Sequence, residues 1–86
     1  MARDRSLVNE IKYPYIIELR VNADKLGFEL GRRIMEFHRA RHIQVRHGRR
    51  IARENEIYFR WCFSDLPTAH GFMERFGGEF CKDVII

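Results

Sequence analysis

Arginine and histidine side chains crowd one segment of this chain, and the chemistry that they offer is the binding of anions. Residues 32–53 hold eight arginines and three histidines against the single acid Glu36, whereas the whole 86-residue chain has a formal net charge of only +4. Guanidinium groups bind phosphate and carboxylate groups through paired hydrogen bonds. The segment therefore predicts a surface for a polyanion or an acidic partner.

The side chains that could carry catalysis lack the neighbours that catalysis requires. His38 and His42 stand four residues apart and could share a metal ion on a continuous helix, but no acid or cysteine follows at a matching spacing. Cys62 lies in a strand-like pattern, where a half-buried thiol is ordinarily inert. The hydroxyl groups of Ser64 and Thr68 fit helix capping better than nucleophilic attack. The sequence thus predicts no enzyme, no catalytic residue, no metal site and no cofactor.

Alternating apolar residues predict the strands that must position the arginines. Segments 13–21 and 57–63 place every second large apolar residue on one face, which we expect to be buried. Segment 41–51 also alternates but carries charge, as an edge strand does to discourage pairing with another chain. We predict its hairpin turn at 53–56, with His47-Gly48 as the alternative turn or as a bulge.

Apolar residues at helical spacing predict a helix between the first two strands. It begins at Asn22 or Asp24 and ends at about Phe37 or Arg39. Its glycines at positions 27 and 31 weaken helix formation by about 1 kcal/mol each relative to alanine. We expect a close approach of the helix backbone to the sheet as the compensation, with an irregular first turn as the alternative.

A second helix is predicted from the pattern F-S-D-L-P-T-A-H-G-F-M-E-R-F-G-G at 63–78. Asp65 and Pro67 suit the start of a helix, and the two glycines suit its end. The pattern resembles a group of short uncharacterised bacterial proteins that read F-x-D-x-x-x-A-x-x-F-x-x-x-F-G-G. That resemblance implies a ferredoxin-like fold and no established activity. Residues 56–63 with this helix are also similar to the second half of RNA-recognition motifs, where Tyr58 would keep one base-stacking aromatic.

The order of the elements predicts a single domain of the α+β class. With a last strand over 79–86, the order becomes strand, helix, strand, strand, helix, strand. This is the ferredoxin-like βαββαβ sandwich, an antiparallel sheet with two helices on one face and a bare face opposite. Residues 1–12 are expected to form a mobile N-terminal arm, and 13–86 the single ferredoxin-like domain.

The bare face of the sheet and the basic segment beside it are where the sequence predicts binding. The candidate residues for a partner or a polyanion are Arg20, Arg41, His42, Arg46, Arg49, Arg50, Tyr58 and Arg60. We expect a non-catalytic binding or assembly module, either a homo-oligomer, first of all a dimer, or a complex with another protein. Nucleic-acid or other polyanion binding through 41–53 and Tyr58 is the alternative. The interpretation without a binding function is a charged edge strand, in which Glu18, Glu54 and Glu56 pair with some of the arginines.

The composition of the chain predicts the cell compartment of such a module. The two cysteines are too few for a disulfide framework, which favours a reducing cytoplasm. No apolar run approaches the roughly 20 residues that span a bilayer, and no hydrophobic segment follows the early arginines as in a signal peptide. We therefore expect a cytoplasmic protein without a membrane partner.

Overall fold

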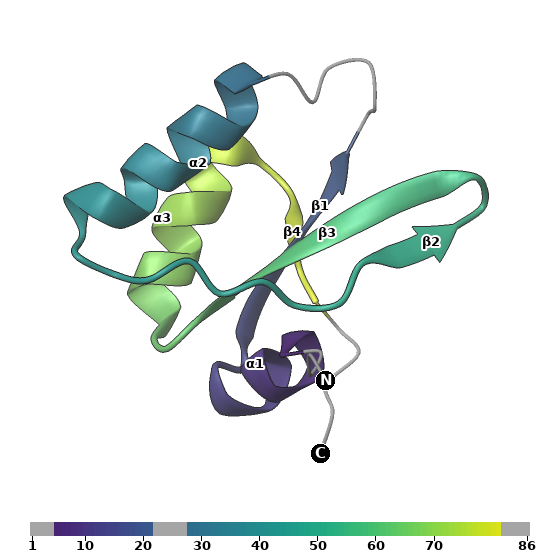
Figure 1. Cartoon of the computed structure of the whole chain (residues 1–86), viewed down its shortest axis with the longest axis horizontal. Coiled ribbons are helices and arrows are strands. Elements are labelled where there is room, and N and C mark those ends of the chain that lie inside the picture. Colours follow the sequence, from purple (N-terminus) through teal and green to yellow (C-terminus); the bar gives the residue numbers. More distant parts are fainter. Residues whose placement is uncertain (1–4, 22–27, 82–86) are drawn as a thin grey trace.

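The computed structural model describes residues 5–21 and 28–81, with the side chains of Val21 and Phe28 left out. The elements in chain order are α1 (Ser6–Lys12), β1 (Tyr15–Val21), α2 (Phe28–Ala40), β2 (Ile51–Arg53), β3 (Glu56–Phe63), α3 (Leu66–Phe76) and β4 (Glu79–Phe80). Figure 1 shows α2 and α3 side by side, with α1 apart from them. The described chain is thus an α+β fold of three helices and one sheet, and none of these helices is long and apolar enough to cross a bilayer.

The four strands form an antiparallel sheet in the order β2-β3-β1-β4. β1 pairs along its whole length with residues 57–63 of β3, with Ile17 opposite Trp61 and Leu19 opposite Phe59. Because side chains alternate across a strand, this register gathers most of the large apolar residues of both strands on one face, called here the core face, while Ile16 lies on the other face. The predicted alternation of both strands is confirmed.

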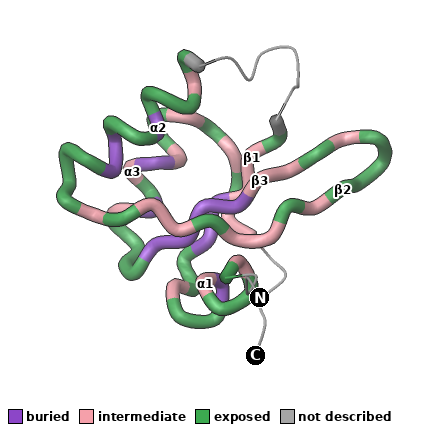
Figure 2. The backbone as a smooth tube through the Cα atoms, viewed as in Figure 1, coloured by how far each residue is buried: buried purple, intermediate pink, exposed green. Residues whose placement is uncertain are grey.

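Helices α2 and α3 cover the core face. The buried cluster consists of Ile17, Ile34, Phe37, Trp61, Phe63, Ala69 and Phe72, and Figure 2 shows the buried backbone concentrated in β1, β3 and the inner sides of the two helices. The Phe37 ring meets the rings of Phe63 and Phe72 edge to face, with centroids 6.2 and 5.5 Å apart. Such aromatic contacts stabilise a core beyond the area that they bury.

The ends of α3 follow from local chemistry. The Asp65 carboxylate accepts a hydrogen bond from the Thr68 amide at 2.8 Å, and Pro67 stands in the first turn. Gly77 ends the helix with a φ of 87°. Gly78 has a φ of 91°, and a Cβ there would lie 2.7 Å from the Glu18 carbonyl oxygen. Only glycine suits that position, and the predicted helix over 66–76 is confirmed.

The edge strand is shorter and less regular than expected. Glu54 and Asn55 form the turn between β2 and β3 with φ angles of 47° and 68°, so the prediction of a turn at 53–56 is confirmed. His47 bridges Trp61 and Ile51 pairs with Tyr58. His47 and Ile51 are four positions apart along the edge segment, whereas their partners Trp61 and Tyr58 are three positions apart along β3. The edge segment therefore has one extra residue, which forms a bulge. The expected strand over 41–51 is therefore corrected to Ile51–Arg53 and one bridge.

Both ends of the chain differ in part from expectation. Ser6–Lys12 form α1, and the Glu10 side chain of this helix is buried against the sheet, so this segment is not an undocked arm. At the other end, Cys81 extends the pairing of β4 through a bond from its amide to the Ile16 carbonyl. The predicted strand residues 82–86, the predicted starts of α2 and Gly27 lie outside the described residues. α2 ends at Ala40, close to the predicted Arg39.

Gly31 offers a simple test of how α2 packs. A Cβ at this exposed glycine would have no atom within 4 Å, so the expected close approach to the sheet is wrong here. We expect Gly31→Ala to raise the free energy of unfolding by about 0.5–1 kcal/mol, because alanine loses less backbone entropy in a helix. Urea denaturation measures the change. A less stable variant would show that Gly31 has a packing role.

Candidate functional site

The face of the sheet opposite α2 and α3, called here the outer face, carries a network of arginines and glutamates. Arg60 of β3 is 1% exposed, and its guanidinium donates to Glu10 of α1 at 3.0 Å and to Glu18 of β1 at 2.9 Å. Arg49 donates to Glu10 from its guanidinium at 3.0 Å and also from its backbone amide. Arg53 donates to Glu18 at 3.2 Å. We call these five residues the Arg–Glu network.

Local features of the sequence bring the network together. The amide of Gly48 donates to the Arg60 carbonyl at 2.7 Å, and a Cβ at Gly48 would lie only 2.8 Å from the Arg60 Cβ. The Asn9 side chain donates to the His47 carbonyl at 2.9 Å and so fixes α1 beside the same segment. Gly48 therefore allows the edge segment to approach β3 closely enough for Arg49 to reach Glu10.

Both glutamates of the network are held in their charged form. Burial alone would raise the pKa of Glu10, but hydrogen bonds from Arg49 and the charge of Arg60 outweigh it and bring this pKa below the ordinary value of 4.5. Burial opposes ionisation of Glu18 as well, and hydrogen bonds from Arg53 and Arg60 lower its pKa in the same way. The carboxylates consequently neutralise most of the arginine charge on the outer face.

We expect the protein to lose stability in acid as these two carboxylates protonate. Their pKa values are lower in the folded chain than in the unfolded one, so the stabilisation is fully present above about pH 4.5 and is lost as the pH falls through the folded pKa values. Urea denaturation at a series of pH values measures this slope. The Glu10→Gln variant should be less stable at neutral pH and show a shallower slope in acid; curves parallel to the wild type would contradict the network.

Three of the predicted binding residues already have acidic partners. Arg49 and Arg60 belong to the network, and Arg20 pairs with Glu56 at 2.9 Å. The expected bare face does not exist at Arg60, because Glu10 of α1 covers it. The interpretation without a binding function, in which acids pair with the arginines, thus holds for Glu18 and Glu56.

The other predicted residues are spread over the surface. Arg41 follows α2 and lies over the Phe37 ring at 3.7 Å, and His42 beside it is exposed with a φ of 55°. Arg46 lies over the Tyr13 ring at 4.0 Å. Arg50 is exposed on the edge segment, and the Tyr58 ring is half-buried opposite Arg20. The structure therefore places Arg49 near Arg60, and Arg20 near Tyr58. It does not gather the eight predicted residues into one site.

Of the candidates for chemistry, His38 and Cys62 are buried, and His42 lies apart from His38. His38 is buried, its Nδ1 donates to the Ile34 carbonyl at 2.8 Å, and burial lowers the pKa of its ring. His42 lies beyond the end of α2, so the two imidazoles do not share a helix face. Burial raises the pKa of the Cys62 thiol to about 12. Among the described residues, no three His, Cys, Asp or Glu side chains are grouped so that they could hold a metal ion.

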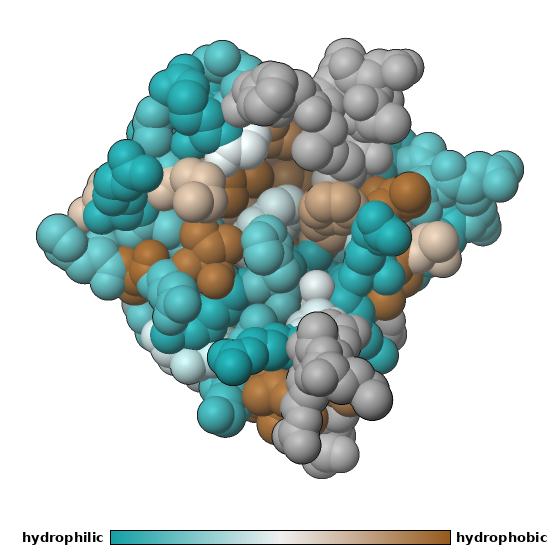
Figure 3. Space-filling model, in the orientation of Figure 1, coloured by the Kyte–Doolittle hydropathy of each residue, from teal (hydrophilic) through white to brown (hydrophobic). Residues whose placement is uncertain are grey.

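Sequence reasoning missed which side of α1 faces the sheet. This helix buries Glu10 and exposes Leu7, Val8 and Ile11 at 42%, 47% and 56%. We call these three residues the α1 patch, and Figure 3 shows hydrophobic atoms on the surface at the position of α1 in the view. The spacing of the three residues places them on one side of a helix, and that spacing was the signal available in the sequence.

Two neighbouring features thus stand out on this side of the described chain. One is the Arg–Glu network, whose Glu10 and Arg60 are buried, and the other is the apolar patch of the helix that the network holds in place. Comparison with known proteins assigns neither of them: no protein-family model, no curated protein and no solved structure matches the chain.

Proposed function

We propose that this chain is a non-catalytic assembly module that binds a second copy of itself through the α1 patch and the adjoining outer face of the sheet. The observation that carries the proposal is that α1 docks by its glutamate and turns Leu7, Val8 and Ile11 to solvent. Burial of apolar surface against a partner contributes about 25 cal/mol per Å². Association would give this helix the hydrophobic stabilisation that it lacks in the single chain.

A second copy suits the chemistry of the patch. A patch of aliphatic residues without charge complements itself, as a two-fold interface requires. A stable interface buries about 800 Å² on each partner, so three side chains would need support from the surface around them. The neighbouring outer face offers Arg20 paired with Glu56, and Arg53 over the Tyr58 ring at 5.2 Å. Charges that are already paired cost less to bury than single ones.

We further propose that the sheet is ferredoxin-like. β1 and β2 are both antiparallel to β3, so they run parallel with β3 between them, and α2 connects them. β3 and β4 flank β1 in the same way, with α3 as their connection. This split βαβ arrangement supports the assignment. We place the module in the cytoplasm, since a chain with only two cysteines suits a reducing compartment.

The alternative function is polyanion binding through the basic segment. It rests on Arg41, His42, Arg46 and Arg50 with Tyr58, because Glu10, Glu18 and Glu56 already bind Arg49, Arg60 and Arg20. Fluorescence anisotropy with a labelled single-stranded oligonucleotide at two salt concentrations distinguishes the two functions. Binding that weakens steeply with salt would favour the polyanion.

Sedimentation equilibrium tests the assembly proposal. We expect the wild type to form dimers at micromolar concentrations, and Leu7→Ser/Ile11→Ser to remain monomeric with an unchanged circular dichroism spectrum. Met35→Ser is the matched control, because Met35 is 51% exposed but lies on α2. A monomeric wild type, or a double variant that associates as well as the control, would refute the proposal.

A further inference from the structure

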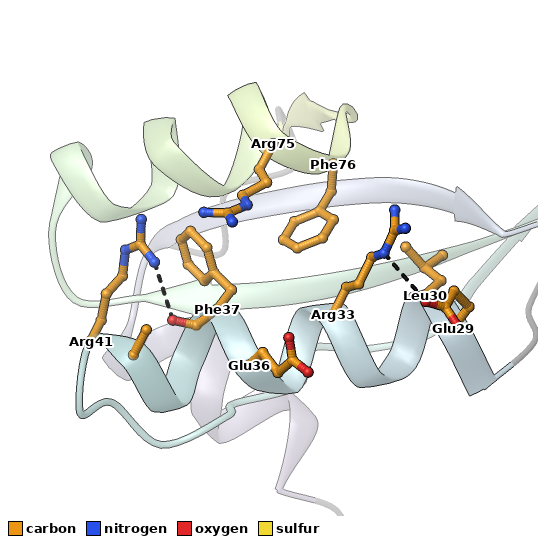
Figure 4. Close-up of a pocket in the computed structure, with 9 residues that line it drawn as sticks. Glu29, Leu30, Arg33, Glu36, Phe37, Arg41, Arg75 and Phe76 are labelled. Atoms are coloured by element: carbon orange, nitrogen blue, oxygen red, sulfur yellow. Dashed lines mark hydrogen bonds and ion pairs between the residues drawn. The ribbon is translucent and has the colours of Figure 1, made fainter.

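A groove with a volume of about 730 Å³ lies between α2 and α3, on surface unrelated to the α1 patch. Its apolar lining comes from Leu30, Phe37 and Phe76, which belong to the core cluster or pack against it. Figure 4 shows the Phe37 and Phe76 rings between the two helices, with arginine side chains on both sides of them. The volume falls in the range of roughly 300–1,000 Å³ that is typical of small-molecule sites.

Positive charge dominates the rim of this groove. Arg33 and Arg41 come from α2 and its end, and Arg75 comes from α3. The glutamates at the rim, Glu29 and Glu36, are both bound by Arg32, at 2.8 and 2.6 Å. Arg33 also pairs with Glu29, at 3.7 Å, so the two glutamates are matched by Arg32, which lies outside the groove, and by Arg33 at its rim. Arg41 and Arg75 remain to attract an anion.

Arg41 is oriented by the groove itself, and Arg75 points towards the same aromatic ring. The Arg41 guanidinium lies 3.7 Å from the centre of the Phe37 ring and donates to the Phe37 carbonyl at 3.2 Å. Figure 4 shows the Arg75 side chain pointing from α3 towards Phe37. Gly71 of α3 leaves room at this end, since a Cβ there would still be 3.9 Å from the Arg41 Nη2. A guanidinium group just past the end of α2 and one from α3 thus flank one aromatic ring.

We propose that the groove binds a small amphipathic carboxylate, with an acidic head and an aromatic or aliphatic body. The head would accept hydrogen bonds from Arg41 and Arg75, as carboxylates commonly do from guanidinium groups. The body would cover the exposed edges of Leu30 and Phe76, which line the groove without being fully buried. Binding here requires neither the α1 patch nor self-association.

Phenylbutyrate is a suitable probe, with neutral phenylbutyramide as the matched ligand without charge. In titrations followed by ¹H–¹⁵N spectra, phenylbutyrate is expected to shift the amides and arginine Nε–H signals of α2 and α3. Arg41→Gln and Arg75→Gln should each weaken its binding about tenfold, the effect of losing one charged hydrogen bond. Arg39→Gln is the control, because Arg39 is exposed on α2 but does not line the groove.

Several results would overturn this site. Equal binding of phenylbutyramide would show that the arginines contribute nothing, and wild-type affinity in both groove variants would show the same. Shifts concentrated in α1 would place the ligand on the α1 patch instead of in the groove. Arg75 lies in the last turn of α3 and is exposed, so Arg75→Gln keeps the test decisive even if Arg41→Gln unfolds.

Discussion

Arg60→Met is expected to lower the free energy of unfolding by about 3–5 kcal/mol, because it removes the shared partner of two carboxylates shielded from water. The side chains of Arg60 and Glu10 are each only 1% exposed, and that of Glu18 is 13% exposed. Urea denaturation followed by circular dichroism measures the loss. Arg50→Met is the matched control: Arg50 is exposed, and its replacement should change stability by no more than about 0.5 kcal/mol.

A double variant separates the loss of the ion pair from a general loss of packing. In Arg60→Met/Glu10→Leu the buried glutamate that Arg60→Met would leave with Arg49 as its remaining partner is also removed, so the combined cost should be smaller than the sum of the two single costs. Simple additivity would mean that Glu10 and Arg60 do not interact. An Arg60→Met variant as stable as Arg50→Met would show that the network does not hold α1 to the sheet.

Trp61→Ala is expected to lower the free energy of unfolding by a similar amount, about 3–5 kcal/mol, because it leaves a large cavity in the core. The indole is 5% exposed and packs against the Phe72 ring with centroids 5.4 Å apart. Ile57 provides the control, since it lies on the same face of β3 but is 42% exposed. Ile57→Ala should therefore cost much less. Thermal unfolding of Trp61→Ala near the wild-type temperature would mean that the assigned core face is wrong.

A smaller substitution at the same position, Trp61→Phe, keeps an aromatic ring and removes the buried indole N–H group. The Trp61 Nε1 group is buried without a hydrogen-bond partner among the described residues. An unsatisfied buried donor costs free energy, so Trp61→Phe should lose clearly less stability than Trp61→Ala. Equal losses in the two variants would indicate that the ring itself contributes little to the packing.

Much of the fold could be predicted because it depends on local chemistry. The alternation in β1 and β3 sorts side chains between two faces whatever lies around them. Asp65, Pro67 and Gly77 fix the ends of α3 through contacts within a few residues of the chain. The turn at Glu54-Asn55 is equally local, since Asn55 tolerates a positive φ better than most residues do. The bounds of these elements agree with the predicted ones to within two residues.

The candidate site could not be predicted in the same way, because its partners are distant in sequence. Arg60 binds Glu10 from 50 residues away and Glu18 from 42 residues away. Hydrophobic patterning assumes that a docked helix turns its apolar side inward, and α1 does the reverse. The bulge before Ile51 likewise depends on the pairing with β3. An arginine-rich sequence therefore looked like an open basic face, although glutamates already occupy part of it.

Intermolecular contacts measured in solution test the assembly proposal most directly. In a mixed sample of ¹³C-labelled and unlabelled protein, isotope-filtered NOE spectra report only contacts between different chains. We predict intermolecular NOEs to the methyl groups of Leu7, Val8 and Ile11, which the single chain leaves exposed. The absence of such NOEs in a sample that sediments as a dimer, or their restriction to Met35 on α2, would contradict assembly through α1.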